Sequence, residues 1–318
     1  MIRQILRRGR DAERASDAPP LAAVTRPPIK WLDPPPGPWT VEKAYAYCEE
    51  FARAHTESYP VASRFVPPEL RPHLVALYAF ARSADDFADE GADSPDIRLG
   101  KLNRYRAELE RVERGMPAED ALFRDVARIV RAHGLPLSLF NDLLDAFSQD
   151  VIKKRYASFS EVSDYCRRSA NPVGRLLLHL FKRTAEAELR ASDAICSALQ
   201  LVNFWQDVDI DYRRDNRIYL PQDEMARHGV TERHLAEQRC DAAWCALMRQ
   251  EVDRVRTLMI SGAPLGRTLP GRIGLEIRAT IQGGLRILDK IEAAGYDVFR
   301  RRPVLKAFDW PLLLLKAV

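Results

Sequence analysis

The stretch that most constrains how this chain can fold is residues 199–221, which read LQLVNFWQDVDIDYRRDNRIYLP. If residues 194–212 form one helix, Asn203, Asp207 and Asp211 lie one turn apart and form a single stripe. Two carboxylates four residues apart repel each other, which costs about 0.2–0.5 kcal/mol, and the apolar neighbours of the stripe favour burial. We therefore expect cations to face this stripe.

A second segment, residues 77–90 (LYAFARSADDFADE), has the same design, with Asp85 and Asp89 one turn apart on an otherwise apolar helix. Two such stripes facing each other would surround a divalent cation with oxygen atoms. Mg²⁺ is usually held by one or two carboxylates together with substrate phosphates. The stripes therefore predict a metal-diphosphate site, against the alternative of a helical bundle whose acidic stripes bind no ligand.

The spacing of apolar residues predicts helices throughout the folded region, and the chain contains no alternating run of strand length and no Asn-Gly hairpin signal. The predicted helical segments are residues 41–58, 68–90, 97–114, 118–132, 136–155, 159–181, 194–212, 221–228, 231–261 and 272–294. A turn is predicted at residues 91–95 and a break at residues 262–271. The predicted fold class is all-α.

With 46% hydrophobic and 30% charged residues, the 318-residue chain has the composition of a globular protein with a sizeable core. Residues 1–39 are rich in arginine and proline and predict a disordered leader. The rest shows no internal repeat and no second compositional regime, so residues 40–318 are predicted to form one domain. The formal net charge of +4 is too small to indicate a nucleic-acid partner.

No stretch approaches the roughly 20 apolar residues of a membrane span, and the leader lacks the apolar region of a secretory signal. We therefore expect a cytoplasmic protein. The arginine-rich leader also fits a transit peptide, although Asp11, Glu13 and Asp17 argue against that interpretation. We interpret it as a basic arm near an anionic membrane surface. The apolar patch at residues 312–315 is predicted to pack on its own domain, with peripheral membrane contact as the alternative.

Five cysteines are present, an odd number without CxxC spacing. They are Cys48, Cys166, Cys196, Cys240 and Cys245. Most lie inside helical patterns, so buried reduced thiols are predicted in preference to disulfides or a zinc site.

Three segments in a fixed order carry a resemblance to a known family. Residues 82–89 (RSADDFAD), 203–211 (NFWQDVDID) and 217–221 (RIYLP), with YCRRSANPVG at 165–174 between them, resemble the squalene and phytoene synthase family. The match extends over about residues 45–301. Gln206 before Asp207 and the SANPVGRLLLHLF segment are similar to the bacterial hydroxysqualene synthases of hopanoid biosynthesis.

The resemblance implies the class I prenyl synthase fold, a helical bundle around a central apolar cavity, with several Mg²⁺ ions that bridge two aspartate-rich helices to a diphosphate. Asp85 and Asp89 match the first metal motif, and Asn203, Asp207 and Asp211 match the second. Arg82, Arg217 and Tyr219 match the residues that contact the diphosphate.

Ionisation of a prenyl diphosphate leaves a carbocation, which an aromatic face stabilises by about 2 kcal/mol or more when desolvated. Tyr59 matches an aromatic residue that lines the substrate channel of the family, and Phe87 is a second candidate. Phe80 and Phe204 are further candidates, for which ordinary core packing is the favoured interpretation.

The chain departs from the family at Arg168, which replaces the tyrosine that squalene and dehydrosqualene synthases use for proton abstraction in the first condensation. An arginine is always protonated and cannot act as a base, although it could bind diphosphate instead. Gln206 replaces an arginine and could either orient a water molecule or hydrogen-bond within the core. Asn171 is a second candidate for placing that water.

These features predict a Mg²⁺-dependent lyase that converts presqualene diphosphate and water to hydroxysqualene and diphosphate. No NADPH is expected, because water rather than hydride captures the cation. The alternatives are a head-to-head prenyltransferase that makes presqualene diphosphate, squalene or phytoene, and a non-catalytic lipid-binding or assembly factor. Handover of product to neighbouring squalene-pathway enzymes is a further expectation.

Overall fold

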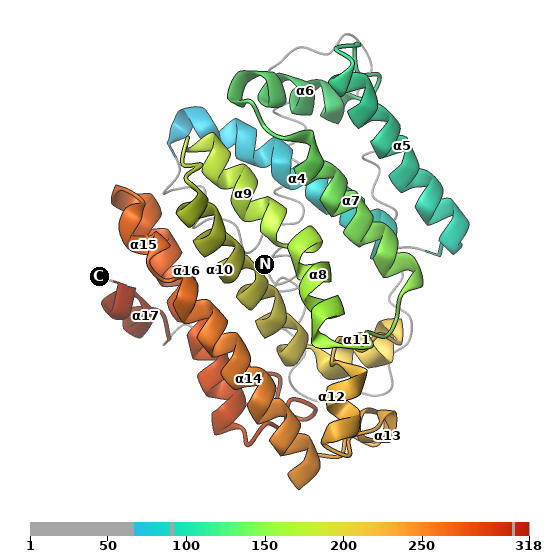
Figure 1. Ribbon diagram of the computed structural model, residues 1–318, viewed down its shortest axis with the longest axis vertical. Helices are drawn as coiled ribbons and strands as arrows, with labels where there is room; N and C mark the ends of the chain where they lie inside the picture. Colours follow the sequence, from blue (N-terminus) through green and yellow to red (C-terminus); the bar gives the residue numbers. More distant parts are fainter. Residues whose placement is uncertain (1–66, 90–91, 307–308, 318) are drawn as a thin grey trace. The chain divides into compact units, whose positions relative to one another are not determined.

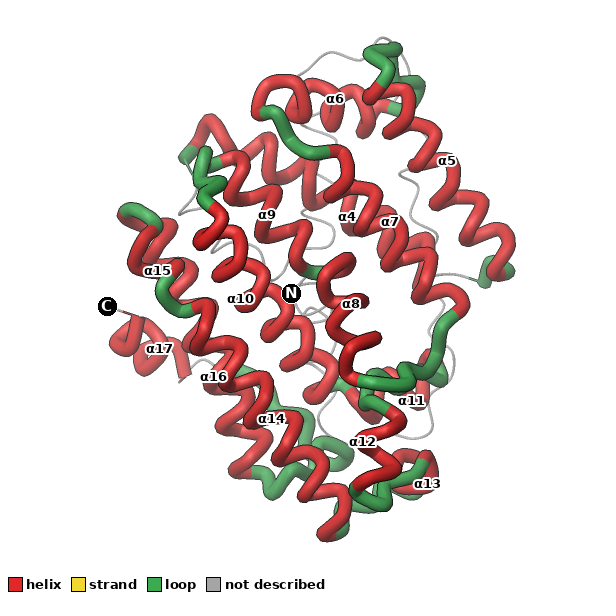
Figure 2. The backbone as a smooth tube through the Cα atoms, in the orientation of Figure 1, coloured by secondary structure: helices red, strands yellow, loops and turns green. Residues whose placement is uncertain are grey.

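The computed structural model describes residues 67–89, 92–306 and 309–317, and every regular element in these ranges is a helix (Figures 1 and 2). The predicted all-α class is confirmed. The predicted helix at residues 41–58 and the leader lie outside the described residues. The chain divides into two compact units, and each is described by itself. The first runs to Ile152 and includes His179–Lys182, and the second comprises Lys153–Leu178 and the chain from Arg183 onward.

The first unit is built around one helix, α4, which packs against α5, α6 and α7. Its elements are η2 (Pro68–Leu70), α4 (Arg71–Asp89), α5 (Pro95–Glu113), α6 (Ala121–His133) and α7 (Leu137–Ile152). Phe80 of α4 is fully buried, and its ring packs against those of Tyr105, Phe123 and Phe140. Core packing, the favoured interpretation of Phe80, is confirmed.

The second unit is built around α10, which packs along α14 and also against α16 and α8. Its elements are α8 (Phe159–Ser169), α9 (Asn171–Leu180), α10 (Glu186–Gln206), α11 (Val208–Asp215), α12 (Gln222–Arg227), α13 (Glu232–Ala236), α14 (Ala242–Gly262), α15 (Leu265–Thr268), α16 (Gly271–Ala293) and α17 (Asp309–Ala317). At Gly262 a Cβ atom would lie 2.6 Å from the Ala191 carbonyl oxygen of α10. A glycine is therefore needed where α14 approaches α10.

The prediction of one helix over residues 159–181 is wrong, because α8 and α9 meet at a break. Ala170 leaves the helical conformation, with φ −120° and ψ −46°. Pro172 is the second residue of α9, and inside a continuous helix it would lack the N–H for the bond to the Arg168 carbonyl and its ring would clash with that carbonyl. The sequence of the turn therefore explains the break.

Two other predicted helices are also divided. The predicted helix at 194–212 is interrupted at Asp207, with α10 on one side and α11 on the other. The stretch 231–261 contains α13 and then α14, because Gln238 adopts a positive φ of 52° and the Asp241 side chain accepts a hydrogen bond from the Trp244 amide and starts a new helix. The predicted break at 262–271 contains the short helix α15, and α16 is followed by one more helix, α17.

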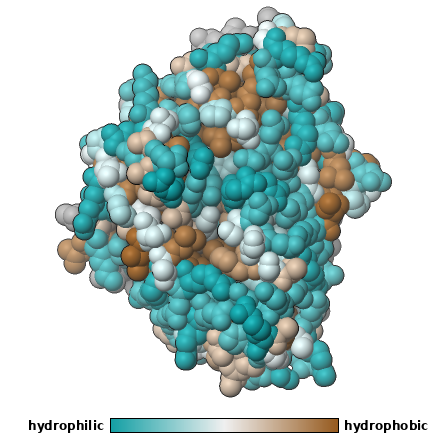
Figure 3. Space-filling view, in the orientation of Figure 1, coloured by the Kyte–Doolittle hydropathy of each residue, from teal (hydrophilic) through white to brown (hydrophobic). Residues whose placement is uncertain are grey.

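The tail helix α17 packs on α16, as predicted for the apolar patch near the end of the chain. Asp309 is buried and forms ion pairs with Arg286 and Lys290 of α16. Leu313 is buried, whereas Leu315 is 76% exposed. Hydrophilic residues cover much of the face drawn in Figure 3, with apolar patches between them. Within the described part of the chain, none of the helices has the length and hydropathy of a transmembrane span.

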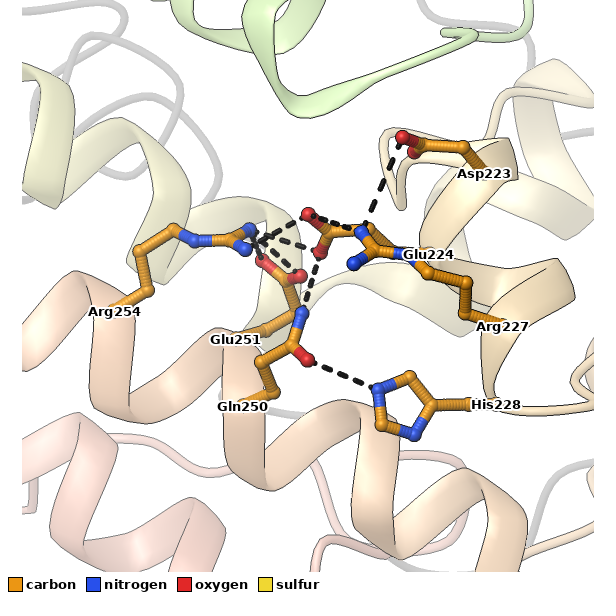
Figure 4. Close-up of polar contacts among 7 residues, drawn as sticks. All are labelled: Asp223, Glu224, Arg227, His228, Gln250, Glu251 and Arg254. Carbon is orange, nitrogen blue, oxygen red and sulfur yellow. Dashed lines mark hydrogen bonds and ion pairs between the residues drawn. The ribbon is translucent and has the colours of Figure 1, made fainter.

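A cluster of charged residues, of which Glu224 and Glu251 are buried, joins α12 to α14 (Figure 4). Arg254 donates to both carboxylate oxygens of Glu224, at 2.8 and 3.0 Å, and to both of Glu251, at 2.9 and 3.0 Å. Gln250 also donates to Glu224, at 2.8 Å. Burial and the neighbouring Glu224 carboxylate raise the pKa of Glu251. Burial opposes ionisation of Glu224 as well, but hydrogen bonds from Glu251 and Arg254 outweigh it and lower the pKa of Glu224.

These opposite shifts predict opposite effects of two glutamine substitutions. Because the folded protein keeps the Glu251 proton that the unfolded chain releases, the contribution of Glu251 to the stability of the wild type falls as the pH rises above about 4.3, by at most about 1.4 kcal/mol per pH unit. Glu251→Gln is therefore expected to match the wild type near that pH and to become more stable than it at higher pH. Glu224→Gln is expected to cost about 1–3 kcal/mol at neutral pH, where Glu224 is the ionised partner of Arg254.

Urea unfolding followed by circular dichroism across this pH range measures both effects. The two variants act as controls for each other, since each makes the same isosteric change on a neighbouring helix. Equal, pH-independent losses of stability in both would contradict the assigned protonation states.

Candidate active site

The predicted stripe of oxygen-bearing side chains is present at the junction of α10 and α11. Asp207 has non-helical dihedrals, with φ −110° and ψ 14°. Its amide nevertheless donates to the Asn203 carbonyl at 2.9 Å, and the Asp211 amide donates to the Asp207 carbonyl at 2.8 Å. Helical hydrogen bonding therefore continues through the interruption, and the three residues keep their one-turn spacing. All three are at most 3% exposed.

Asp207 already faces a cation in this structure. Arg302 Nε lies 2.6 Å from Asp207 Oδ1, and Arg302 Nη2 lies 3.3 Å from Oδ2, so the guanidinium engages both carboxylate oxygens. The adjacent Gln206 is buried, and its side-chain amide donates to the Pro303 carbonyl. Of the two roles left open for Gln206, hydrogen bonding within the core is the one this contact supports. The segment that contains Arg302 and Pro303 is thus attached to the second acidic motif.

Asn203 differs from its two carboxylate neighbours. Its side chain is buried, and neither its amide nitrogen nor its amide oxygen has a hydrogen-bond partner among the described residues. Leaving a buried polar group unpaired costs about 1–3 kcal/mol, so such an atom calls for an explanation. A ligand that coordinates the amide oxygen would supply one.

Asp211 lies beside the segment predicted to contact the diphosphate. The Arg217 amide donates to the Asp211 carbonyl at 3.1 Å, and Arg217 Nη1 donates to the Tyr219 hydroxyl at 3.3 Å. Arg217 is only 1% exposed. A small pocket is lined by Asp211, Arg217 and Tyr219 together with Phe204, Trp205, Val208, Ile218 and Leu220. The structure therefore brings these three predicted site residues together.

Phe204 and Tyr219, which line this pocket, belong to a cluster of aromatic rings. The rings of Phe204 and Tyr219 stack with centroids 3.5 Å apart and an interplanar angle of 7°. Tyr156 and Tyr165 pack against Tyr219 at 5.3 and 5.6 Å. All four residues are buried. Core packing, the favoured interpretation of Phe204, describes these contacts.

The first acidic motif lies in the other unit, near the C-terminal end of α4. Arg82 Nη2 lies 2.5 Å from Asp86 Oδ1, and Arg82 Nη1 lies 3.6 Å from Asp85 Oδ2. All three side chains are buried, whereas Asp89 is half-buried. Phe87 packs edge-on against Tyr105, with centroids 5.1 Å apart. That this motif faces the stripe on α10 and α11 stays a prediction, and Tyr59 lies outside the described residues.

Arg168 and Asn171 lie on either side of the break between α8 and α9. Arg168 pairs with Asp164 one turn earlier on α8, with Nη2 2.8 Å from Oδ2. Asn171 is buried, and its amide oxygen accepts a hydrogen bond from the Ser197 hydroxyl of α10 at 2.8 Å. Neither contact assigns a role to a water molecule, so the predicted role of Asn171 stays a prediction.

Comparison with known proteins decides the family. The model of the squalene/phytoene synthase family matches residues 52–309, which include both acidic motifs. The chain belongs to the squalene/phytoene synthase family. It is 37% identical over 222 residues to a hydroxysqualene synthase of Rhodopseudomonas palustris. The alignment covers 70% of this chain and 74% of the relative. The chain is 33% identical over 266 residues to a phytoene synthase of Thermus thermophilus, covering 83% and 89% respectively.

The family member also resembles a solved structure. The squalene synthase HpnC of Alicyclobacillus acidocaldarius superposes with a TM-score of 0.75 at 35% identity, over 80% of this chain and 94% of that one. The predicted class I isoprenoid synthase fold is therefore confirmed, and the chain is an isoprenoid-synthase enzyme by family.

Sequence reasoning missed one residue of the site, Arg302. A run of three arginines, Arg300 to Arg302, is visible in the sequence of this family member, but nothing in the run indicates which of them meets Asp207. The partners are 95 residues apart in the chain, and spacing patterns detect only neighbours within a few turns.

The residues present in this family member fit the predicted Mg²⁺. Asp207 and Asp211 are buried carboxylates, and the buried amide oxygen of Asn203 has no partner in the described part of the chain. Carboxylate and amide oxygens are ligands of hard cations. Arg302 would have to share or release Asp207 when a metal ion binds.

Proposed function

We propose that this protein converts presqualene diphosphate and water to hydroxysqualene and diphosphate in a Mg²⁺-dependent reaction. The C–O bond to the diphosphate breaks, and the diphosphate leaves with the bonding electrons. The cyclopropylcarbinyl cation that remains rearranges, water adds to it, and the added water loses a proton. The reaction needs neither a second prenyl diphosphate nor a hydride from NADPH.

Arg168 is the observation that carries this proposal. It stands where the resembling squalene synthases have the tyrosine assigned to proton abstraction, and a guanidinium cannot take up a proton. Its guanidinium forms an ion pair with Asp164. An enzyme that receives presqualene diphosphate has no use for that base. The relatives named hydroxysqualene synthase support the same choice.

The side chains that would hold Mg²⁺ belong to the two acidic motifs of the family. They are Asp85, Asp89, Asn203, Asp207 and Asp211. Bound Mg²⁺ would neutralise charge on the departing diphosphate. Arg82 and Arg217, both buried, would donate to its oxygens through their fixed fork of N–H groups. The buried rings of Phe204 and Tyr219 would help to exclude water from the pocket.

Two other functions remain candidates. Head-to-head prenyl transfer is supported by the similarity to phytoene synthase of Thermus thermophilus, and the arginine at position 168 argues against it. A non-catalytic lipid-binding or assembly role would leave the metal residues without a purpose, and all five are present. We also propose peripheral contact with a membrane surface, since the substrate is a lipid, with the exposed Leu315 as one contact.

Incubation of the purified protein with Mg²⁺ and no NADPH separates these functions. Presqualene diphosphate and farnesyl diphosphate are offered in separate reactions, and the lipid products are identified by mass spectrometry. Hydroxysqualene is expected from presqualene diphosphate only, and a chelator is expected to abolish it. Consumption of farnesyl diphosphate would contradict the interpretation of Arg168, and no reaction with presqualene diphosphate would contradict the proposed function.

A further inference from the structure

Two cysteines lie next to each other where α14 begins. The Sγ atoms of Cys240 and Cys245 are 3.7 Å apart, and both residues are half-buried. The prediction that the cysteines are buried is therefore wrong for this pair, although it is confirmed for Cys166 and Cys196. Cys48 lies outside the described residues.

The local structure explains why the two thiols meet. Asp241 is the N-cap of α14, so Cys240 occupies the position before the cap and Cys245 the fourth position of the helix. Residues at these two positions of a helix commonly pack against each other as a hydrophobic staple. Helix capping therefore brings the thiols together and holds them near each other without a covalent bond.

Both thiols also contact Gly295, where the segment of residues 295–302 begins, and the other end of this segment reaches the candidate active site. Cys240 Sγ is 3.6 Å and Cys245 Sγ is 3.5 Å from the Gly295 carbonyl oxygen, within hydrogen-bonding distance for sulfur. The Trp244 indole donates to the next carbonyl, that of Tyr296, at 3.0 Å. Further along the same segment, Arg302 pairs with Asp207.

We propose that Cys240 and Cys245 form a redox-active dithiol that a hydroperoxide converts to an intrachain disulfide. A disulfide requires the sulfur atoms to approach from 3.7 Å to about 2.05 Å. The exposure of both residues gives a small oxidant access.

The order of the steps follows from the protonation of the pair. Burial and the hydrogen bond with Cys245 raise the pKa of the Cys240 thiol to about 12, so Cys240 keeps its proton. The Cys245 sulfur attacks a peroxide oxygen, the O–O bond breaks, and the departing hydroxide takes the Cys245 proton, so that a sulfenic acid and water form. Cys240 sulfur then attacks the Cys245 sulfur, the S–O bond breaks, and the leaving hydroxide takes the Cys240 proton. The two sulfurs lose a pair of electrons, and the hydrogen peroxide is reduced to water.

Oxidation changes what the Gly295 carbonyl contacts. A disulfide carries no S–H, so neither sulfur can donate to this oxygen after oxidation. The segment from Gly295 to Arg302 is then held less firmly at its start. Oxidation of the pair is therefore expected to loosen the segment that holds Arg302 against Asp207.

Peptide mapping of the native protein tests the proposal. Trypsin releases both cysteines in one peptide, because Arg239 and Arg249 bound residues 240–249. After hydrogen peroxide treatment, alkylation and digestion, this peptide is expected to be lighter by a pair of hydrogen atoms and to carry no alkyl group until it is reduced. Amide exchange in residues 295–302 is expected to be faster in the oxidised protein.

The variants Cys240→Ser and Cys245→Ser, made in a Cys48→Ser background, are matched controls. Cys240→Ser is expected to leave a sulfenic acid at Cys245 that dimedone traps, and Cys245→Ser is expected to leave none at Cys240. Alkylation of both thiols after peroxide treatment would overturn the proposal and leave the pair a structural staple. Unchanged exchange in residues 295–302 after disulfide formation would overturn the connection to Arg302. Burial raises the pKa of Cys166 and Cys196 to about 12 and about 11, so both are expected to stay reduced.

Discussion

Replacing Asp207 with alanine is expected to abolish turnover of presqualene diphosphate while the helix content stays near that of the wild type. A metal ion that stabilises a leaving group contributes several kcal/mol, so loss of a ligand lowers kcat by on the order of 10³-fold or more. Asp85→Ala, in the first acidic motif, is expected to have the same effect. The measurements are hydroxysqualene formation under saturating Mg²⁺ and far-UV circular dichroism.

Asp209→Asn is the matched control for Asp207→Ala. Asp209 lies two residues further along, and its carboxylate accepts from Arg213 at 2.8 Å and from Gln238 at 3.1 Å, away from the stripe. Its replacement is expected to change turnover by less than about threefold, because the i,i+4 ion pair with Arg213 that it removes is worth only about 0.2–0.5 kcal/mol. Full activity in Asp207→Ala or Asp85→Ala would refute the metal assignment. Equal loss in Asp209→Asn would show that any change in α11 disrupts activity.

The all-α class and the approximate position of most described helices could be predicted because apolar spacing is a local property. The apolar positions of α4, with Leu74, Leu77 and Tyr78, recur at three to four residues, and all three side chains are buried. The same spacing identified the stripe from Asn203 to Asp211, since three residues at four-residue intervals stay on one face even with the interruption at Asp207.

The interruptions themselves depend on single backbone conformations that periodicity does not encode. The break at Ala170 follows from Pro172, because a proline interrupts the hydrogen bonds of a continuous helix. The end of α13 depends on Gln238 at a positive φ of 52°, and non-glycine residues adopt this conformation only rarely. Apolar residues continue on both sides of such a residue, so the pattern alone joins the two helices.

The sequence predicts that a cation lies opposite the stripe of Asn203, Asp207 and Asp211, but not which residue supplies it. Repulsion between carboxylates predicts that a cation lies opposite, and the structure provides Arg302 against Asp207. A metal ion satisfies the same electrostatic requirement. A motif that predicts a metal ion therefore gives no reason to expect an arginine beside Asp207 as well. The two interpretations are compatible if Arg302 is the counter-ion of the protein without its metal.

Replacing Asn203 with leucine is expected to make the metal-free protein more stable and the enzyme less active. Both polar atoms of this side chain are buried without partners in the described residues, and removing an unpaired buried polar group recovers about 1–3 kcal/mol. Leucine has nearly the same size, so little cavity or overpacking strain is expected. Turnover is expected to fall because the amide oxygen can no longer coordinate Mg²⁺.

Thermal unfolding with and without Mg²⁺ and diphosphate tests both halves of this expectation, since ligand binding to the folded state raises the Tm. The wild type is expected to gain stability from the added ligands and Asn203→Leu to gain much less. Asn171→Leu is the control, because the Asn171 amide oxygen accepts a hydrogen bond from Ser197 at 2.8 Å and its loss should destabilise the protein. A destabilised Asn203→Leu that still responds to Mg²⁺ would assign Asn203 to the core and leave the carboxylates alone to bind the metal.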